Sequence, residues 1–297
     1  MKKKIVVIGS VNIDMIAKVP HIPAPGETVL GTGFFTVQGG KGANQAVAAS
    51  RAGGEVSFLA CVGEDSFGKE ALEAYAKEKI DIAYIKKTAK APTGVALINV
   101  AASGENSIAV APGANSQLMP DDILKNEKLL ANASVILVQL EVPLETIETA
   151  AGIAVKYKVP FILNPAPAQK LEASLLGKVT ILTPNEQEAE LLAGIKASPA
   201  ELATRLVSMG VKSVIITLGK EGAIYTSNEQ EITHLPGIKA EAVDTTAAGD
   251  TFNGYLAAEI AAGKSLKQAV ELANKAAALS VTRMGAQPSV PFKAELD

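Results

Sequence analysis

The stretch VDTTAAGDTFNG, residues 243–254, places small side chains between two aspartates, where an extended segment gives way to an Ala-rich helix. Small residues at a helix start leave its first backbone N–H groups open to an anion. We therefore expect an anion hole formed by Ala247, Ala248 and Gly249. A carboxylate at Asp250 would repel a phosphate unless it served as a base toward a hydroxyl group that attacks that phosphate. The alternative for Asp250 taken alone is a helix N-cap.

Short β-branched runs without alternation occur along the chain, a pattern typical of strands buried on both faces of a parallel sheet. They are KIVVIGS, VSFLACVG, SVILVQLE, VPFILN, VTILTPNE and VKSVIITLG. Helical patterns separate most of them, such as SPAELATRLVSMG, in which the N-cap Ser198 precedes Pro199. Two further helices are expected at about residues 251–262 and 266–282. The alternation predicts right-handed crossovers and an α/β fold with a doubly wound, mostly parallel central sheet and helices on both faces.

Two segments break this alternation. TGVALINVAASGENSIAVAPGAN has two alternating strands around a Gly-Glu-Asn turn, and DMIAKVPHIPAPGETVLGTGFFTVQGG is extended and Pro-rich. We expect the two segments to pair as a small β-sheet lid, through excursions at about residues 15–38 and 93–112. The whole chain, residues 1–297, then forms a single catalytic domain.

Composition excludes several classes of partner. The net charge of −3 and the absence of Trp argue against nucleic acid, which requires a basic face and stacking platforms. No run approaches the roughly 18 apolar residues of a membrane span. The basic N-terminus lacks a signal-peptide pattern, because Asn12 and Asp14 interrupt its apolar run, and Cys61 is the only cysteine. We expect a cytoplasmic protein that binds neither nucleic acid nor membrane.

A second polar group lies near the N-terminus. GSVNID is expected to end the first strand with Asn12 and Asp14 on one face, and GGKGAN places Lys41 and Asn44 just before a helix. Polar groups at the carboxyl end of such a strand suit a polyhydroxylated ligand. The alternative for GGKGAN is a glycine-rich turn with an exposed lysine. The chain has no Walker A motif. It also has no GxGxxG after the first strand, and this second absence disfavours a Rossmann dehydrogenase.

Together these stretches resemble the ribokinase family of sugar kinases. The resemblance rests on GGKGANQAVAASRAGG and DTTAAGDTFNGYLAA, and continues through GSVNID, TGVALI, PGAN, QLE, NPAPA, TPNEQEAE, TLGKEGA and VTRMGAQPSVP. It spans nearly all of the chain in the order expected of the family. It implies transfer of the γ-phosphoryl group of ATP to O5 of D-ribose, with Mg²⁺ and an activating K⁺, and a homodimer formed through the lid.

Other acceptors stay open within the same fold: deoxyribose, fructose, a nucleoside or a ketodeoxy sugar acid. A nucleoside requires an apolar enclosure, and the lid segments offer only Phe34 and Phe35 as aromatic residues. A sugar acid would favour an additional basic residue beside Lys41. A non-catalytic sugar-binding sensor is a further alternative, although it would need neither Asp250 nor an anion hole.

The resemblance also implies roles for matching positions. Asp250 is the implied catalytic base, and Ala247, Ala248 and Gly249 form the implied anion hole. The implied sugar-binding residues are Asn12, Asp14, Gly40, Lys41, Asn44, Glu141 and Asp250. The implied nucleotide-binding residues, including an N-x-x-E element that organises magnesium, are Asn185, Glu188, Thr217, Gly219, Gly222, Gly249 and Asn274. The implied monovalent-cation residues are Asp244, Thr246, Ser280, Arg283, Gly285 and Ser289.

Two positions depart from residues that are frequent in the family. Many members have Gly where this chain has Ala247, and similar members often have His where it has Asn274. The methyl group of Ala247 leaves the backbone amide in place, but it favours backbone angles outside the region that glycine alone adopts readily.

Overall fold

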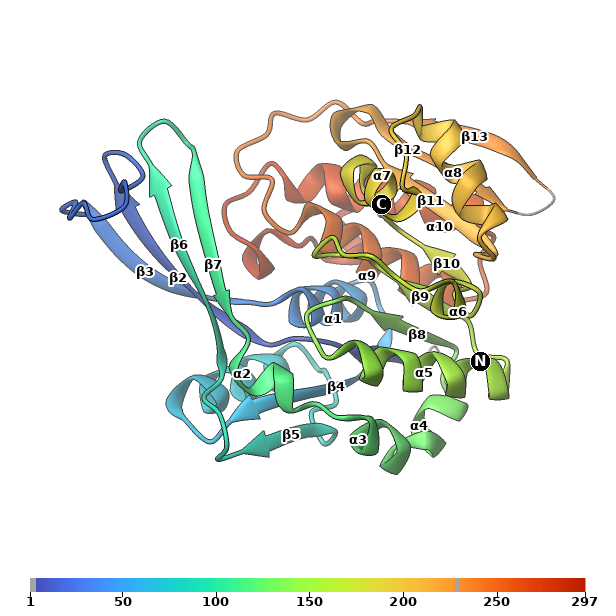
Figure 1. Cartoon of the computed structure of the whole chain (residues 1–297), viewed down its shortest axis with the longest axis horizontal. Helices are drawn as coiled ribbons and strands as arrows, with labels where there is room; N and C mark the ends of the chain where they lie inside the picture. The colour runs from blue at the N-terminus through green and yellow to red at the C-terminus, as the bar shows by residue number, and fades with distance from the viewer. Residues whose placement is uncertain (1–3, 228–229, 297) are drawn as a thin grey trace.

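A large, mostly parallel sheet forms the middle layer of the computed structural model, which describes residues 4–227 and 230–296 (Figure 1). Its strands lie in the order β13-β12-β11-β10-β9-β8-β1-β4-β5. Their bounds are β1 (Lys4–Ile8), β4 (Glu55–Gly63), β5 (Ile85–Thr88), β8 (Val135–Val138), β9 (Phe161–Leu163), β10 (Ile181–Leu182), β11 (Ser213–Thr217), β12 (Gly222–Ser227) and β13 (Gln230–Pro236). Neighbours from β11 to β5 pair in parallel, whereas β12 pairs antiparallel with β11 and β13.

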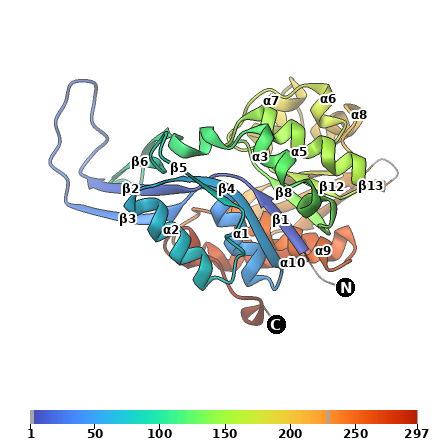
Figure 2. The same cartoon turned by 90° about the horizontal axis from the view of Figure 1, so that it is seen from below.

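The predicted doubly wound sheet is confirmed, and helices cover both of its faces (Figure 2). One face packs against α1 (Lys41–Arg51), α2 (Ser66–Lys77), α9 (Ala248–Ala261) and α10 (Leu266–Ser280). The other packs against α3 (Pro120–Lys125), α4 (Glu127–Ala131), α5 (Leu144–Tyr157), α6 (Ala173–Leu176), α7 (Glu186–Ala193) and α8 (Pro199–Ser208). Short 3₁₀ turns lie at Gly113–Gln117, Gly219–Glu221, Gln287–Ser289 and Lys293–Glu295. Within the described ranges, no helix has both the length and the apolar character needed to cross a bilayer.

The central strands are apolar throughout because both of their faces are buried. Ile5 and Val7 of β1 belong to the core on the α1 side, whereas Val6 and Ile8 belong to the core on the α5 side. Alternate residues of one strand therefore supply two separate cores, and a strand of this kind has no polar face. The sequence patterns missed β5 at one edge and the β12–β13 hairpin at the other.

Helix α9 lies directly against α1, and this contact brings the two predicted polar groups together. A side chain at Gly254 of α9 would meet the carbonyl oxygen of Gln45 at 2.7 Å and the backbone nitrogen of Ala49 at 2.7 Å. The helices can approach this closely because glycine has no side chain there. α9 begins at Ala248, three residues before the predicted start, so the small-residue run belongs to the helix end itself.

A small sheet projects from one side of this body (Figure 1). Its order is β3-β2-β6-β7, with bounds β2 (Asn12–Val19), β3 (Gly33–Gly39), β6 (Gly94–Ala101) and β7 (Asn106–Ala111). β2 and β6, one from each predicted excursion, pair in parallel. Because β1 ends at Ile8, Asn12 and Asp14 begin β2, and their predicted position at the end of the first strand is wrong.

Candidate active site

Polar side chains follow the carboxyl ends of the central parallel strands. These residues are Ser10 after β1, Gln139 and Glu141 after β8, Asn164 after β9, and Thr183 after β10. From β1 the chain continues to β4 on one side of the sheet, whereas β8 leads to β9 on the other. The order of strands therefore reverses between β1 and β8, and open α/β sheets bind ligands outside such a reversal.

Asp250 lies at this edge of the sheet, in the first turn of α9, and its side chain is buried. Asn44 donates a hydrogen bond from Nδ2 to Asp250 Oδ2 at 3.0 Å, and Gln45 donates one from Nε2 to Asp250 Oδ1 at 2.9 Å. The N-cap position belongs to Ala247, so the alternative interpretation of Asp250 as a helix cap is wrong. Each carboxylate oxygen has one amide donor and keeps a second lone pair for a ligand.

The backbone of Ala247 has φ 59° and ψ 13°, in the left-handed region. The expectation that this alanine avoids the angles that favour glycine is therefore wrong. The conformation costs an alanine roughly 1–2 kcal/mol, and it turns the chain sharply into α9. Gly249, two residues further on, is exposed, and a Cβ built on it meets no atom within 4 Å. The start of α9 is thus open on the side that we expect to face an anion.

Helix α1 begins at Lys41, so Lys41 and Asn44 lie inside its first turn and not before it, as the sequence pattern suggested. Gly40 has φ 90°, and a Cβ there would lie 2.8 Å from the backbone nitrogen of Asn12, so only glycine fits without strain. Glu141 Oε2 accepts hydrogen bonds from the backbone N–H of Lys41 at 3.0 Å and from Ser10 Oγ at 2.5 Å. Its carboxylate therefore lies at the positive end of α1.

Asp14 lies close to the paired glycines before α1. A Cβ at Gly39 would lie 2.3 Å from Asp14 Oδ1, so that glycine leaves the space which the carboxylate occupies. Partial burial and the nearby charges of Glu141 and Asp250 raise the pKa of Asp14 from 3.8 to about 6, whereas Lys41 opposes the rise. A carboxylate of this kind loses its charge in mildly acidic solution.

Asn12, the other predicted residue of this strand, is buried and fixed by Asn115. Asn115 donates from Nδ2 to Asn12 Oδ1 at 2.8 Å, and its own Oδ1 accepts from the backbone N–H of Val11 at 2.8 Å. A side chain at Gly94 would lie 2.3 Å from Asn12 Oδ1. Asn115 was not predicted as a site residue, although it ends the PGAN motif.

Lys41 and Glu188 line a small cavity of about 150 Å³ that also contains Asp250 and the start of α9. Burial alone would lower the pKa of the Lys41 ammonium. Its pKa is nevertheless raised by four surrounding carboxylates, those of Asp250, Glu141, Glu188 and Asp14. Lys41 is half-buried and positively charged, and the alternative of an exposed turn lysine is wrong.

The N-x-x-E element forms the start of α7. Asn185 Oδ1 accepts from the backbone N–H of Glu188 at 2.8 Å, and Glu188 Oε2 accepts from the backbone N–H of Asn185 at 2.9 Å. Burial, with Asp250 as a like charge, raises the pKa of Glu188, although the Asn185 hydrogen bond and Lys41 oppose the rise. The capping pair uses only Oε2 of Glu188, and this side chain also lines the small cavity.

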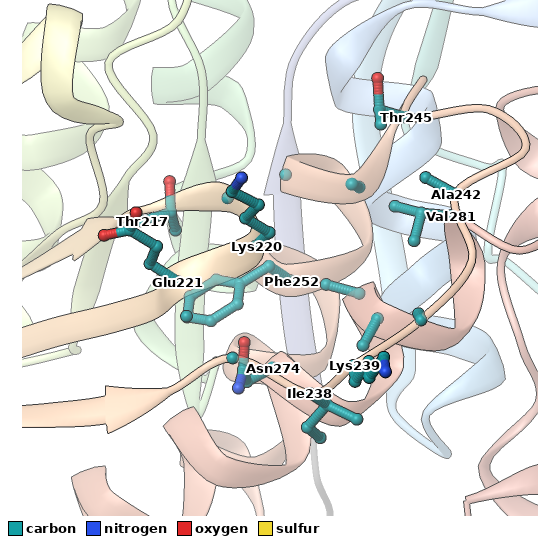
Figure 3. Close-up of a pocket in the computed structure, with 18 residues that line it drawn as sticks. Thr217, Lys220, Glu221, Ile238, Lys239, Ala242, Thr245, Phe252, Asn274 and Val281 are labelled. Carbon is teal, nitrogen blue, oxygen red and sulfur yellow. The ribbon is translucent and has the colours of Figure 1, made fainter.

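A larger cavity of about 610 Å³ adjoins the small one (Figure 3). It is lined by Thr217, Gly219, Lys220, Glu221, Gly222, Gly237, Ile238, Lys239, Ala240, Ala242, Thr245, Ala248, Gly249, Phe252, Asn274, Ala277, Ala278 and Val281. Figure 3 shows Thr217 and Lys220 on one side and Ala242 and Val281 on the other. The lining is mostly glycine, alanine and apolar side chains. Thr217, Thr245, Ala248 and Gly249 line both cavities, which therefore meet at the start of α9.

The predicted nucleotide-binding residues fall into these two cavities. Thr217, Gly219, Gly222, Gly249 and Asn274 line the larger one, whereas Asn185 and Glu188 line the smaller one. The amide of Asn274 donates to the carbonyl oxygen of Pro236 at 3.2 Å, which fixes its orientation. Sequence patterns missed Phe252 and the apolar wall of the cavity, because neither has a residue type or spacing that marks a binding site.

The structure brings together only some of the predicted monovalent-cation residues. Asp244 accepts from the backbone N–H of Thr246 at 2.9 Å and from that of Gly285 at 2.8 Å, and thereby joins two loops. Burial favours a higher pKa for Asp244, but these hydrogen bonds outweigh it and lower the pKa. The Arg283 guanidinium instead pairs with Glu295 at 2.6 Å.

The hydroxyl groups of the two predicted serines bind carbonyl oxygens in their own segments. Ser280 donates to Ala277 at 2.8 Å, and Ser289 donates to Ala286 at 2.7 Å. Across residues 4–227 and 230–296, no group of three or more His, Cys, Asp or Glu side chains is arranged to hold a metal ion. A cation at the predicted magnesium site or at the predicted monovalent-cation site would therefore depend on carbonyl oxygens, phosphate or water for most of its ligands.

This fold and site define a small-molecule kinase: a buried carboxylate lines a small, mostly polar cavity, and the open start of one helix lines both this cavity and a larger one. The family model described as pfkB family carbohydrate kinase matches residues 2–293, and the chain belongs to this family.

Related proteins match over nearly their full length. The chain is 44% identical over 299 residues to the ribokinase of Haemophilus influenzae, covering 99% of this chain and 97% of that one. It is 37% identical over 292 residues to the deoxyribokinase of Salmonella typhi, covering 97% and 95%. The structure of Arabidopsis thaliana ribokinase complexed with ribose and ATP superposes with a TM-score of 0.93 at 31% identity, covering 100% of this chain and 98% of that one.

Proposed function

We propose that this protein transfers the γ-phosphoryl group of ATP to O5 of D-ribose, giving D-ribose 5-phosphate and ADP. The observation that carries this proposal is the position of Asp250, a buried carboxylate that lines the small cavity directly after Gly249, a residue that lines both cavities. Full-length similarity to the Haemophilus influenzae ribokinase, and to an Arabidopsis ribokinase structure with ribose and ATP, supports both substrates.

In this mechanism Asp250 takes the proton from the attacking hydroxyl group. The amides of Ala247, Ala248 and Gly249 at the start of α9 stabilise the charge that develops on the phosphoryl oxygens, and the N–H of Ala248 would exchange its 3.3 Å contact with the carbonyl oxygen of Thr245 for this role. The Lys41 ammonium remains charged among its carboxylate neighbours and adds positive charge in the same small cavity. The groups for proton removal and for charge stabilisation thus line the same small cavity.

The ribose would lie on the β2 and α1 side of Asp250. Asp14 in its ionised form can accept protons from two neighbouring hydroxyl groups, and Asn12 and Asn44 offer amide partners. Gly40 and Glu141 complete this set, since Glu141 fixes the start of α1.

Magnesium and potassium are further parts of the proposal. Mg²⁺ prefers oxygen ligands and retains water and phosphate, so the capping pair of Asn185 and Glu188 fits a supporting role from one carboxylate oxygen. When bound with ATP, the ion supplies charge neutralisation for the phosphates. A K⁺ site fits the loops joined by Asp244, because its carboxylate accepts from the backbone N–H groups of Thr246 and Gly285 and so holds together two loops whose carbonyl oxygens would supply the ligands.

We also propose that the lid sheet closes over the sugar and pairs with the lid of a second copy. Exposed apolar side chains on this sheet, those of Phe34, Leu97, Ile108 and Val110, support such a contact. Pairing would also protect the outer strands of the sheet. We assign the reaction to the cytoplasm, and we expect no nucleic-acid or membrane partner.

The test is a coupled assay of ADP release with ATP and Mg²⁺, with and without K⁺. The acceptor panel contains ribose, deoxyribose, fructose, adenosine and ketodeoxygluconate. We expect the highest kcat/KM with ribose, and stimulation by K⁺. A preference for deoxyribose, the alternative that similarity to the Salmonella typhi deoxyribokinase keeps open, would replace the acceptor but retain the mechanism. Ribose binding without ADP release would indicate a sensor.

A further inference from the structure

Two chains of side-chain amides end on the Asp250 carboxylate. In the first, Gln139 donates from Nε2 to Gln45 Oε1 at 2.6 Å, and Gln45 donates from Nε2 to Asp250 Oδ1 at 2.9 Å. In the second, Gln287 donates from Nε2 to Asn44 Oδ1 at 3.2 Å, and Asn44 donates from Nδ2 to Asp250 Oδ2 at 3.0 Å. Each oxygen of the carboxylate is therefore held by an amide whose own oxygen is occupied.

The first chain is sealed from water, because Gln45 and Gln139 are both 0% exposed. Nε2 of Gln45 also donates to Asn164 Oδ1 at 3.0 Å, and Asn164 in turn donates to the carbonyl oxygen of Thr183 at 3.1 Å. Reversing the Gln45 amide would turn its oxygen toward two acceptors and its NH₂ group toward a donor. The surroundings thus fix which end of Gln45 faces Asp250.

Gln139 is held in place at a cost to folding. Within the described part of the chain, its Oε1 has no hydrogen-bond partner although it is buried. A Cβ at Gly9 would lie 2.1 Å from this oxygen, so the glycine leaves just enough space for the amide. A buried, unpaired amide oxygen is unfavourable, and an apolar side chain of similar size would avoid that cost. The contact with Gln45 gives a reason for an amide at this position.

We propose that Gln45 is a positioning residue for phosphoryl transfer, and that Gln139 fixes the orientation in which Gln45 holds Asp250 Oδ1. This inference rests on the proposed function, in which Asp250 is the base. A base is effective when a free lone pair points at the hydroxyl proton, and rotation of its carboxylate misdirects that lone pair. One amide donor on each oxygen prevents the rotation and leaves the other lone pair of each oxygen free.

The first test is Gln45→Met, which retains the length of the side chain and removes both donors. We expect kcat with ribose to fall about 10- to 100-fold, in the range produced by small misplacements of a reacting group. The KM for ribose and its Kd from calorimetry should change less than about threefold, because the effect acts mainly in the transition state.

The second test compares Gln139→Glu with Gln139→Met. A glutamate cannot donate to Gln45 Oε1 when it is ionised, and it attracts the NH₂ end of Gln45 away from Asp250. Methionine removes the donor without attracting that end. We therefore expect kcat to fall further with Gln139→Glu than with Gln139→Met, and both variants to retain ribose affinity.

Thr251→Val is the matched control, because Thr251 is buried beside Asp250 and its Oγ1 has no partner within residues 4–227 and 230–296. Thermal unfolding and ribose calorimetry on every variant separate misfolding from misplacement. Unchanged kcat in folded Gln45→Met, or equal losses in the two Gln139 variants, would overturn the positioning role. If Gln45→Met lost ribose affinity as well as kcat, Gln45 would instead be a residue that maintains the structure of the whole site.

The assay also separates this inference from the proposed function. If the wild-type protein prefers another acceptor, the ribose assignment fails, and the same variants are compared on that acceptor. If no acceptor in the panel causes the wild-type protein to release ADP, both the proposed phosphotransfer and the positioning role of Gln45 are overturned.

Discussion

The sugar end and the nucleotide end of the site are built in opposite ways. At the sugar end, side chains from distant segments bind one another, as Asn44 does with Asp250 and Asn115 does with Asn12. The larger cavity is formed mostly by glycine, alanine and apolar side chains, and one of its polar residues, Asn274, is bound to the backbone of Pro236. One end is a network of side chains, whereas the other is a shaped surface.

The difference follows from what each end has to do. A base must point at one hydroxyl group, so its side chain has to be held on several sides. A nucleotide is large, and much of its binding can come from shape, apolar contact and backbone N–H groups. Single side-chain changes should therefore have large effects at the sugar end and small effects at the nucleotide end.

The largest effect is expected for Asp250→Asn. This substitution retains the shape of the side chain but removes its capacity to take a proton, so kcat should fall by about 10²- to 10⁴-fold. Ribose affinity should stay within about threefold of that of the wild-type protein, because the amide retains the size and shape of the carboxylate and the proton is taken mainly in the transition state. Steady-state kinetics and ribose calorimetry measure the two quantities separately.

Asn also replaces one acceptor oxygen with an NH₂ group, which would face either Asn44 or Gln45. Thermal unfolding of Asp250→Asn shows whether this clash changes the fold. Near wild-type turnover in a folded variant would remove Asp250 from the role of base, and the comparison between the two ends would lose its strongest case.

The same contrast explains what the sequence could predict. The buried strands are visible in the sequence because β-branched runs without alternation reflect burial on both faces. Asp250 is visible because a charge among small residues is unusual, and Asp14 is visible because it lies two positions from Asn12, on the same face of an extended segment. The function of Gln45 is not visible, since its partners Gln139 and Asp250 lie 94 and 205 residues away in the chain.

The missed elements have physical reasons as well. β5 (Ile85–Thr88) has only four residues, two of them lysines, and β13 (Gln230–Pro236) is an edge strand that is mostly exposed, so neither shows the apolar run of a buried strand. The wall of the larger cavity consists of residues such as Ala277 and Val281, which are equally common in any helix. A binding surface made of backbone and small side chains has no compositional signature.

The second prediction concerns Asp14. Asp14→Asn should raise the KM for ribose about 10- to 100-fold, because an amide cannot accept two hydroxyl protons with the strength of a carboxylate. The effect on kcat should be smaller, since Asp14 lies away from the transferred group in the proposed mechanism. A fall in kcat with an unchanged KM would instead place Asp14 next to the reacting hydroxyl group.

The pH dependence of ribose binding sharpens this prediction. The pKa of Asp14 is raised to about 6, chiefly by burial and further by Glu141 and Asp250, whereas Lys41 opposes the rise. Below that pH the carboxyl group is protonated, so ribose Kd should increase as pH falls, approaching about tenfold per pH unit. Calorimetry from pH 5 to pH 8, run alongside Asp14→Asn as control, should show this increase in the wild-type protein alone.

The smallest effect is expected at the nucleotide end, for Asn274→Ala. The side chain lines the larger cavity, but its NH₂ group already binds Pro236, and most of the lining residues are glycine, alanine or apolar. The KM for ATP should rise only about two- to fivefold with kcat retained, since a lost neutral contact at a surface of this kind is worth about 1 kcal/mol or less. Initial rates at varied ATP and saturating ribose measure it. A 100-fold rise would mean that Asn274 is a specific base-reading contact, and that the nucleotide end depends on single side chains as strongly as the sugar end does.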